Sequence, residues 1–446
     1  CTAAGESFAS GQLAGGDFYV YYSLDENGDA KVPRIAIRMD GKNRIGEIRG
    51  IAYGQNMESE MMPILNKKLN EFPDKDNYLK KVHDMDLLTL IDKKTTHNKE
   101  LSVDEVRFLY EVDREIIGFG YQKDPRINEI KQKRNKVKDY NLVFKYNKEF
   151  NGDLDLRDLT SAEGLNLSGT NIGGYLDLGN LKNAEGLELP KSIGGDLALD
   201  NLRSAEGLDL SEVNIGGNLN LWHLTSAEGL ELPKSIGGDL ALGRLRSAEG
   251  LDLSRVNIGG VLNLGGLTSA EGLDLSGVKV GGSLNLRGLT SAEDLNLSVV
   301  NIGGVLNLGG LMSAKGLNLS GSNIVDTLYL DSLTSAEDLN LSGVNIGGKL
   351  NLGGLRSAEG LDLSGANIAG YLDLSGLTST EGLDLSGVNI GGDLGLDSLI
   401  DAEDLNLSEV NIGGDLNLKN LESAGWLELP KSVGGDLNLK SLKSAE

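Results

Sequence analysis

Carboxylate side chains recur at a fixed spacing through the last two thirds of the chain, and they are the residues best suited to chemistry. One set is the Glu of a repeated Ser-Ala-Glu-Gly motif. A second set is the acidic residue three positions later, between two leucines. Regularly spaced carboxylates can attract basic proteins or, where they converge, hard cations. We select as a candidate binding surface Glu206, Asp209, Glu228, Glu231, Glu249, Asp252, Glu271, Asp274, Glu359, Asp362, Glu381 and Asp384.

Three roles compete for these two acidic columns. The first is a solvated face that keeps the protein from aggregating, and the second is an electrostatic surface for a basic protein partner. The third is calcium bound between neighbouring repeats, which the absence of GGxGxDxUx and EF-hand motifs disfavours. We therefore predict a basic protein partner, no metal and no cofactor. An acidic surface repels phosphates, so nucleic acid is disfavoured as a ligand of the repeats.

The net negative charge of the chain comes entirely from the repeats. The chain has 446 residues with 66 acidic and 42 basic side chains, a formal charge of −24. Residues 1–150 hold 25 of each sign, which leaves 41 acidic against 17 basic residues in 151–446. Like charges stacked in one column repel, and this repulsion could explain the Asn residues that interrupt the second column. Those residues are Asn166, Asn296, Asn318, Asn340 and Asn406.

The elements that must position these side chains repeat a unit typified by LTSAEGLDLSGVNIGGDLNLGG. Its Ile-Gly-Gly corner recurs every 22 or 21 residues, and each 21-residue step ends at LELPKSIGG or LELPKSVGG, where Pro190, Pro233 or Pro430 opens a shorter turn. A fixed period of this length predicts stacked coils. We expect a mainly β fold: an elongated β-solenoid of about 13 coils over residues 149–446, preceded by a small α+β domain over residues 1–148.

Each coil is expected to contain two Leu-x-Leu strands with inward Leu and an outward polar residue. One ladder would hold Leu251-Asp252-Leu253 and its equivalents, and the other Leu262-Asn263-Leu264. Ile258, Leu267 and Ala270 would complete an aliphatic core. The Gly-Gly pair after Ile258 would need positive φ or close backbone approach. The Asn257 and Ser269 columns would bond to corner backbone groups and to neighbouring coils.

These residues resemble a known class of repeat. LTSAEGLDLSGVNI is similar in length and Leu positions to the 22-residue leucine-rich repeats of internalin-type bacterial proteins, and LELPKSIGG resembles the LxxPxSV turn of BspA-type repeats. The resemblance covers about two thirds of the chain and implies a binding surface. It departs at Val256, where the leucine-rich pattern places Asn, and in its second Leu-x-Leu strand. We therefore expect a two-sheeted solenoid with less curvature than a horseshoe.

One coil breaks the pattern. Lys315 replaces the Glu, Val325 and Asp326 replace the Gly-Gly pair, and Tyr329 replaces the outward Asn or Asp. Sequence drift and a local binding spot are the two explanations.

The first 150 residues lack the repeat. Strands are expected at Asp17–Leu24, Val32–Met39 and Arg44–Ala52, joined by the DENGD and DGKN turns. Helices are expected at about 60–72 and 77–95, and a capping box links Ser102 with Glu105. Residues 123–138 indicate one basic helix. YNLVFKY, residues 140–146, would form a strand that covers the first coil.

An enzymatic or nucleic-acid-processing activity in residues 1–148, with the solenoid as a targeting arm, is the alternative function. The chain has one Cys and three His, with no HExxH spacing. Cys1 could be a nucleophile, but the missing initiator Met and the last residues SAE predict a fragment. The segments CTAAGES, GGDFYVYYSLDENG and EIRGIA resemble an uncharacterised bacterial domain, which implies no activity.

The sequence contains no signal peptide and no apolar run long enough to span a membrane. We expect a cytoplasmic protein if the chain is near complete, and a cell-surface protein if an export signal has been lost.

Overall fold

The computed structural model describes residues 15–446 except 120–121, 276–277, 294, 404 and 445–446. Cys1 and the CTAAGES segment therefore lie outside the described residues. Internal contacts divide the chain into two compact units, residues 1–143 and 144–446. Each unit is described by itself.

The first unit begins with a three-stranded antiparallel sheet in the order β1-β2-β3. Its strands are β1 (Phe18–Leu24), β2 (Ala30–Asp40) and β3 (Arg44–Arg49). The Asp25 carboxylate accepts the backbone amides of Asn27 and Asp29, both at 2.9 Å, and so fixes the first hairpin turn. One face of the sheet buries Ile35, Ile37 and Met39 from alternate positions of β2, as a period of two requires. The predicted strands are confirmed.

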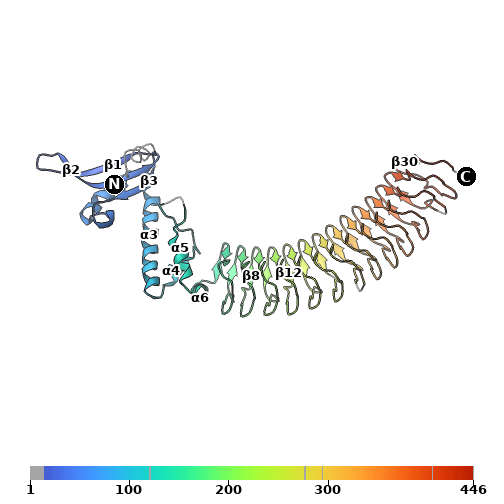
Figure 1. The fold of residues 1–446 in the computed structure, drawn as a ribbon, viewed down its shortest axis with the longest axis horizontal. Coiled ribbons are helices and arrows are strands. Elements are labelled where there is room, and N and C mark those ends of the chain that lie inside the picture. Colours follow the sequence, from blue (N-terminus) through green and yellow to red (C-terminus); the bar gives the residue numbers. More distant parts are fainter. Residues whose placement is uncertain (1–14, 120–121, 276–277, 294, 404, 445–446) are drawn as a thin grey trace. The chain divides into compact units, whose positions relative to one another are not determined.

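Helices follow the sheet (Figure 1). They are the 3-10 turns η1 (Tyr53–Gln55) and η2 (Ser59–Met61), then α2 (Met62–Leu69), α3 (Lys75–Thr96), α4 (Val103–Leu109), α5 (Arg126–Gln132) and α6 (Lys136–Tyr146). The Ser102–Glu105 capping box is present at the start of α4, with both reciprocal hydrogen bonds formed.

Two predictions for this region are wrong. The basic segment 123–138 is two helices rather than one, because α5 ends at Gln132 and α6 begins at Lys136. Residues 140–146 are helical and not a strand. Their buried side chains, Tyr140, Val143 and Phe144, follow the i, i+3, i+4 spacing of a helix face.

The second unit is a solenoid of about 13 coils, in which successive coils lie side by side (Figure 1). Every solenoid strand pairs in parallel with the strands one coil away, and within the described residues these strands form two sheets. The 13-stranded sheet, here named the corner sheet, contains β4 (Glu149–Phe150), β6 (Asn171–Ile172), β8 (Ser192–Ile193), β10 (Asn214–Ile215), β12 (Ser235–Ile236), β14 (Asn257–Ile258), β16 (Lys279–Val280), β18 (Asn301–Ile302), β20 (Asn323–Ile324), β22 (Asn345–Ile346), β24 (Asn367–Ile368), β26 (Asn389–Ile390) and β28 (Asn411–Ile412).

The 14-stranded sheet is named the Leu-x-Leu sheet, because its strands begin at the first Leu of that motif. It contains β5 (Leu154–Asp155), β7 (Leu176–Asp177), β9 (Leu197–Ala198), β11 (Leu219–Asn220), β13 (Leu240–Ala241), β15 (Leu262–Asn263), β17 (Leu284–Asn285), β19 (Leu306–Asn307), β21 (Leu328–Tyr329), β23 (Leu350–Asn351), β25 (Leu372–Asp373), β27 (Leu394–Gly395), β29 (Leu416–Asn417) and β30 (Leu437–Asn438).

One of the two predicted ladders is confirmed and the other is confirmed only in part. The Leu262 ladder is continuous. Equivalents of Leu251-Asp252-Leu253 pair only through single bridges, which run unbroken from Asp274 to Asp362 and also join Asp209 to Glu231. The continuous second ladder instead runs through the Asn257–Ile258 pair and its equivalents.

The aliphatic core is confirmed. Leu251, Leu253, Ile258, Leu262 and Leu264 of one coil are each at most 5% exposed, and so line the solenoid interior. Leu residues of successive coils stand in register, as Leu240, Leu262 and Leu284 do. Each coil therefore completes its apolar core only against its neighbours.

The Gly-Gly corner is a site of close approach. A Cβ on Gly259 would lie 2.2 Å from the carbonyl oxygen of Gly237 in the preceding coil. Positive φ, the other predicted reason, occurs instead at the Gly of the Ser-Ala-Glu-Gly turn, such as Gly250 with φ 78°. The corner Asn residues partly form the expected ladder, since Asn389 Nδ2 donates to Asn367 Oδ1 at 2.6 Å.

Candidate binding surface

The Glu column stands on a backbone turn of fixed geometry. In each of these turns the Ser hydroxyl oxygen accepts the Glu amide, at 3.2 Å for Ser204 and Glu206 and at 3.1 Å for Ser247 and Glu249. The following Gly has positive φ, which completes the turn without a Cβ penalty. This confirms that the Ser column bonds to backbone. The Glu side chains are exposed at Glu206, Glu228, Glu249, Glu271, Glu359 and Glu381.

The second acidic column caps a turn. Asp209 Oδ1 accepts the Ser211 amide at 2.9 Å and the Ser211 hydroxyl at 2.7 Å. Asn406 makes the same two contacts with Ser408, at 2.8 and 2.7 Å. Asp and Asn are therefore interchangeable as turn acceptors. This geometry accounts for the mixture of Asp and Asn in the column without any appeal to charge repulsion.

The same contacts affect ionisation. Hydrogen bonds from the Ser hydroxyl and then from its backbone amide hold the pKa of Asp209, Asp252 and Asp384 below the usual range. Each of these carboxylates is exposed, so the column is charged at neutral pH and open to solvent. Asp362 likewise accepts the Ser364 amide, at 2.9 Å.

Glu231 differs from the other members of the second column because it precedes Pro233 in a short coil, where it pairs with Asp209 through a single bridge. Asp274 pairs in the same way with Asn296 and is exposed, as the other members are. All twelve residues selected from the sequence thus lie on the outside of the solenoid.

The irregular coil places Lys315, Asp326 and Tyr329 in three different columns. Lys315 occupies the Glu position, and its amide donates to Ser313 Oγ at 3.3 Å. Asp326 stands at the corner and accepts the Thr327 hydroxyl at 3.0 Å. Tyr329 is in β21, between Asn307 and Asn351 of the neighbouring strands. The coil keeps the ladder despite its changed sequence.

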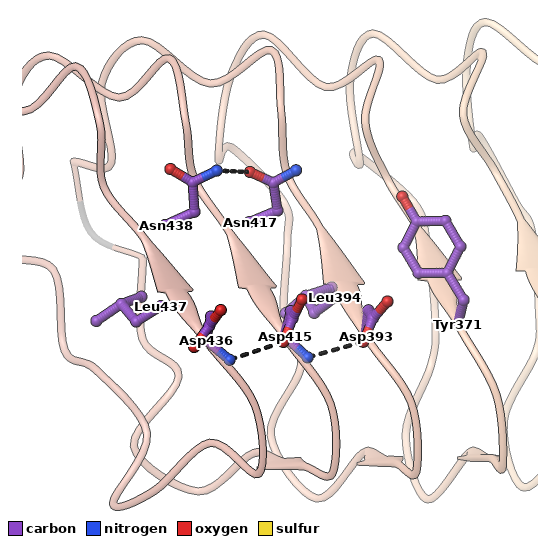
Figure 2. A pocket seen from close by; sticks show the side chains of 8 residues that line it. All are labelled: Tyr371, Asp393, Leu394, Asp415, Asn417, Asp436, Leu437 and Asn438. Carbon is purple, nitrogen blue, oxygen red and sulfur yellow. Dashed lines mark hydrogen bonds between the residues drawn. The ribbon is translucent and has the colours of Figure 1, made fainter.

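A surface that sequence reasoning missed lies along the outside of the Leu-x-Leu sheet. We name this surface the front face; in each coil it consists of the residue before the first Leu, the residue between the two Leu and the residue after the second. A pocket of about 460 Å³ on it is bordered by Tyr371, Asp393, Asp415 and Asn417 (Figure 2). The signal that could have found it is the variation of these three positions from coil to coil.

The front-face carboxylates at the pocket are held by backbone groups. Asp393 Oδ1 accepts the Asp415 amide at 2.7 Å, and Asp415 Oδ1 accepts the Asp436 amide at 2.7 Å (Figure 2). One oxygen of each carboxylate thereby supports the next coil. Asn218 makes the same contact with the Asp239 amide, at 2.7 Å. An Asn can therefore replace Asp here without loss of the hydrogen bond.

Tyr371 borders the pocket and is itself close to a cation. Lys349 Nζ lies 4.8 Å from the centroid of its ring and 2.7 Å from Asp373 Oδ2. Burial, followed by the charges of Asp373 and Asp397, raises the pKa of Tyr371. The Tyr371 hydroxyl therefore remains protonated and can act as a hydrogen-bond donor.

A second pocket, of about 440 Å³, lies in the first unit and includes Arg38, Glu47, Arg49 and Tyr78. Its charged groups pair with neighbours: Arg38 bonds to Asp40, and Arg49 Nε donates to Glu47 Oε1 at 2.6 Å. Burial and the nearby charges of Glu47 and Asp86 raise the pKa of Tyr78 to about 12. Tyr78 is therefore no base at neutral pH.

The basic side chains before the solenoid are also engaged. Arg134 Nε and Nη2 donate to the two oxygens of Asp139, at 2.7 and 2.6 Å. Lys138 Nζ lies 3.0 Å from Glu100 Oε1. Much of this positive charge is balanced within the first unit.

No group of three or more His, Cys, Asp or Glu side chains among the described residues is arranged to hold a metal ion. None of the described helices is long and apolar enough to cross a bilayer. Comparisons with protein-family models, with curated proteins and with solved structures found no match.

Proposed function

We propose that this protein is a binding scaffold whose acidic solenoid recognises a basic protein partner. The observation that carries the proposal is the exposed Glu column, in which side chains project from turns fixed by Ser hydroxyls and Gly residues. Equivalent residues of neighbouring coils are about 4.8 Å apart, the spacing of paired strands. Like charges at this spacing repel, and a cationic partner relieves that repulsion.

The second acidic column contributes charge to the same proposal, although its geometry also serves the fold. Asp209, Asp252, Asp362 and Asp384 each use Oδ1 to cap a turn, which leaves the net negative charge facing solvent. Recognition of this kind speeds encounter and weakens as salt screens the charges. The affinity would come from many shallow contacts distributed along the coils.

We also propose kinship with leucine-rich repeats of the internalin and BspA types. The 22-residue period and the inward Leu residues support it. The continuous sheets lie at Asn257–Ile258 and at Leu262–Asn263 and their equivalents.

We do not favour the alternative of an enzyme or nucleic-acid-processing module in residues 1–148. The charged groups that border the pocket of the first unit, including Arg38 and Arg49, are paired with carboxylates, and Tyr78 stays protonated. This arrangement supports a folded accessory domain more than a catalytic one.

The proposal is tested by capturing partners on the immobilised full chain at low and high salt and identifying them by mass spectrometry. A basic protein should be retained at low salt and released at high salt. Its affinity is then measured by calorimetry against a variant that removes three charges from consecutive coils: Glu228→Gln, Glu249→Gln and Glu271→Gln.

A matched control removes three exposed charges from the first unit: Glu26→Gln, Glu60→Gln and Asp76→Asn. We expect the solenoid variant to bind about tenfold more weakly and the control to bind as the unmodified chain does. Equal affinities of the two variants, or retention that salt does not change, would contradict the proposal.

A further inference from the structure

The front face varies from coil to coil, whereas the turn that carries the Glu column is nearly constant. Among 14 equivalent positions, the Ala of Ser-Ala-Glu-Gly is retained in 13 and the Glu in 12. The front-face position before the first Leu instead holds seven residue types over its 14 occurrences: Asp, Tyr, Asn, Val, Ser, Thr and Lys. A varied face on a repeated scaffold suits recognition of a specific ligand, since each coil can then contribute a different contact.

Aromatic side chains are concentrated on the same face. Residues 151–446 contain five Phe, Tyr or Trp residues, and four of these lie in front-face positions. The four are Tyr175, Trp222 and Tyr329, which are 37–39% exposed, and Tyr371, which is half-buried. Tyr and Trp dominate the energetics of protein interfaces because they bury a large area at a low cost in conformational entropy. Solubility alone does not explain this placement.

The position of Tyr371 beside the pocket depends on a missing side chain. Gly395 stands between Asp373 and Asn417 in register, where other coils have mostly Asn or Asp. The Tyr371 hydroxyl occupies the vacated space, 2.1 Å from where a Gly395 Cβ would be. Figure 2 shows Asp393, Asp415 and Asp436 in one row, Asn417 and Asn438 in a second row, and Tyr371 at one end. A groove runs between the two rows.

Two Lys side chains of the protein itself already bind to carboxylates of the front face. Lys349 Nζ lies 2.7 Å from Asp373 Oδ2 and over the Tyr371 ring. Lys419 Nζ lies 2.8 Å from Asp397 Oδ1. A Lys ammonium is thus matched by the combination of carboxylate and aromatic ring that the front face offers.

We propose that the groove bordered by Tyr371, Asp393 and Asp415 binds an extended basic segment of a protein partner. A Lys side chain of that segment lies with its ammonium at the Asp393 and Asp415 carboxylates and its methylene stem beside Tyr371, while Asn417 bonds to the peptide backbone. This inference rests on the proposed function, which supplies the positive charge of the partner. It adds which face and which groove bind the partner, and that the bound segment is an extended basic peptide.

The test uses the full chain and a blocked Gly-Lys-Gly-Lys-Gly pentapeptide, with Gly-Ser-Gly-Ser-Gly and a neutral oligosaccharide as comparison ligands. Binding is followed by ligand-observed NMR titration. The groove variant combines Asp393→Asn with Asp415→Asn, which retains the amide acceptor, as Asn218 does. The matched control makes the same change twice in the same column away from Tyr371, at Asp196 and Asp239. A third variant, Gly395→Asn, displaces the Tyr371 ring from its place beside the groove without removing charge.

We expect the Lys peptide alone to bind, and to bind about tenfold more weakly to the groove variant and to Gly395→Asn than to the control. Equal weakening by the groove and control pairs would overturn the groove while leaving the acidic scaffold intact. Binding of the oligosaccharide without the Lys peptide would overturn the basic occupant. The Glu column variant should lose the basic protein partner but still bind the pentapeptide. Failure of one proposal can therefore be distinguished from failure of the other.

Discussion

Asp252 accepts both the backbone amide and the hydroxyl of Ser254 through one carboxylate oxygen, Oδ1, at 2.9 and 2.7 Å. The contact needs an oxygen acceptor and not a charge, because Asn340 makes it equally with Ser342, at 3.0 and 2.7 Å. Charge and turn stability can therefore be separated at this position by choice of substitution.

We predict that Asp252→Asn changes the free energy of unfolding by less than about 0.5 kcal/mol, whereas Asp252→Ala lowers it by about 1 kcal/mol, the typical cost of a lost cap. Urea denaturation of both variants measures the difference. Hydrogen exchange at the Ser254 amide reports the local effect. If Asn destabilised the coil as much as Ala, the shared-oxygen account would be wrong.

Substitution of an inward Leu should be far more costly than substitution of its outward neighbour. Leu262 is 0% exposed, so Leu262→Ala should cost about 2–5 kcal/mol. Asn263→Ser should cost about 1 kcal/mol, since Asn263 Oδ1 accepts the Gly265 amide at 3.0 Å. Hydrogen exchange should reveal opening centred on this coil for Leu262→Ala. Similar losses for the two variants would show that the inside and outside are misassigned.

A methyl group at the corner should disturb the stacking of coils. A Cβ on Gly237 would lie 2.0 Å from the Gly216 carbonyl oxygen, which the backbone can avoid only by moving. We expect Gly237→Ala to destabilise the solenoid by about 1–3 kcal/mol. Gly152→Ala is the control, because a Cβ there meets no atom within 4 Å. In thermal denaturation, the transition midpoint should be lowered for Gly237→Ala and unchanged for Gly152→Ala.

The first unit should lose stability in acid through Asp84. This side chain is 0% exposed, and Arg114 Nη1 and Nη2 donate to its two oxygens, at 2.7 and 2.5 Å. Burial alone would raise the pKa of Asp84, but hydrogen bonds from Arg114 and the Ile117 amide outweigh it and hold the pKa below the usual range. The stabilisation is therefore complete above the unfolded-state pKa of about 4 and is lost as pH falls through the folded-state pKa.

Asp84→Asn should flatten this acid-induced loss and lower stability at neutral pH by on the order of 2 kcal/mol. The exposed pair of Arg107 and Asp113 provides a control, since Asp113→Asn should change stability by less than about 1 kcal/mol. Stability measured between pH 3 and pH 7 by circular dichroism checks both. An unchanged pH profile in Asp84→Asn would contradict the assignment.

The sequence predicted the solenoid well because its core obeys a repeating pattern. The structure buries Leu262, Ile258 and Ala270, as predicted. A fixed period also allows only one register in which successive coils stack. The Leu251-Asp252-Leu253 ladder was right only in part, for a local reason. The Ser two residues on bonds to the outward Asp or Asn and turns the chain before a second residue can pair, so that Asn340, for example, makes only single bridges. Alternation alone cannot distinguish a strand from the approach to such a turn.

The candidate surface was predictable only in part. Exposure of Glu249 or Asp252 follows from alternation and turn chemistry within one repeat. The groove depends on how residues of neighbouring coils meet, and Tyr371 can lie at its end only because Gly395 has no side chain there. The helix at residues 136–146 was missed because its spacing of buried residues, such as Tyr140 and Phe144, was mistaken for alternation.

Because each coil pairs in parallel with the next, the length of the solenoid is set by its number of repeats. Removal of residues 259–280, one whole repeat, would join Ile258 to Gly281 and restore the same register, because Gly281 follows Val280 as Gly259 follows Ile258. Such an in-frame deletion shortens the stack by a single step of about 4.8 Å and changes the separation of everything attached on either side. Loss or duplication of whole repeats therefore gives the chain a discrete way to change its span.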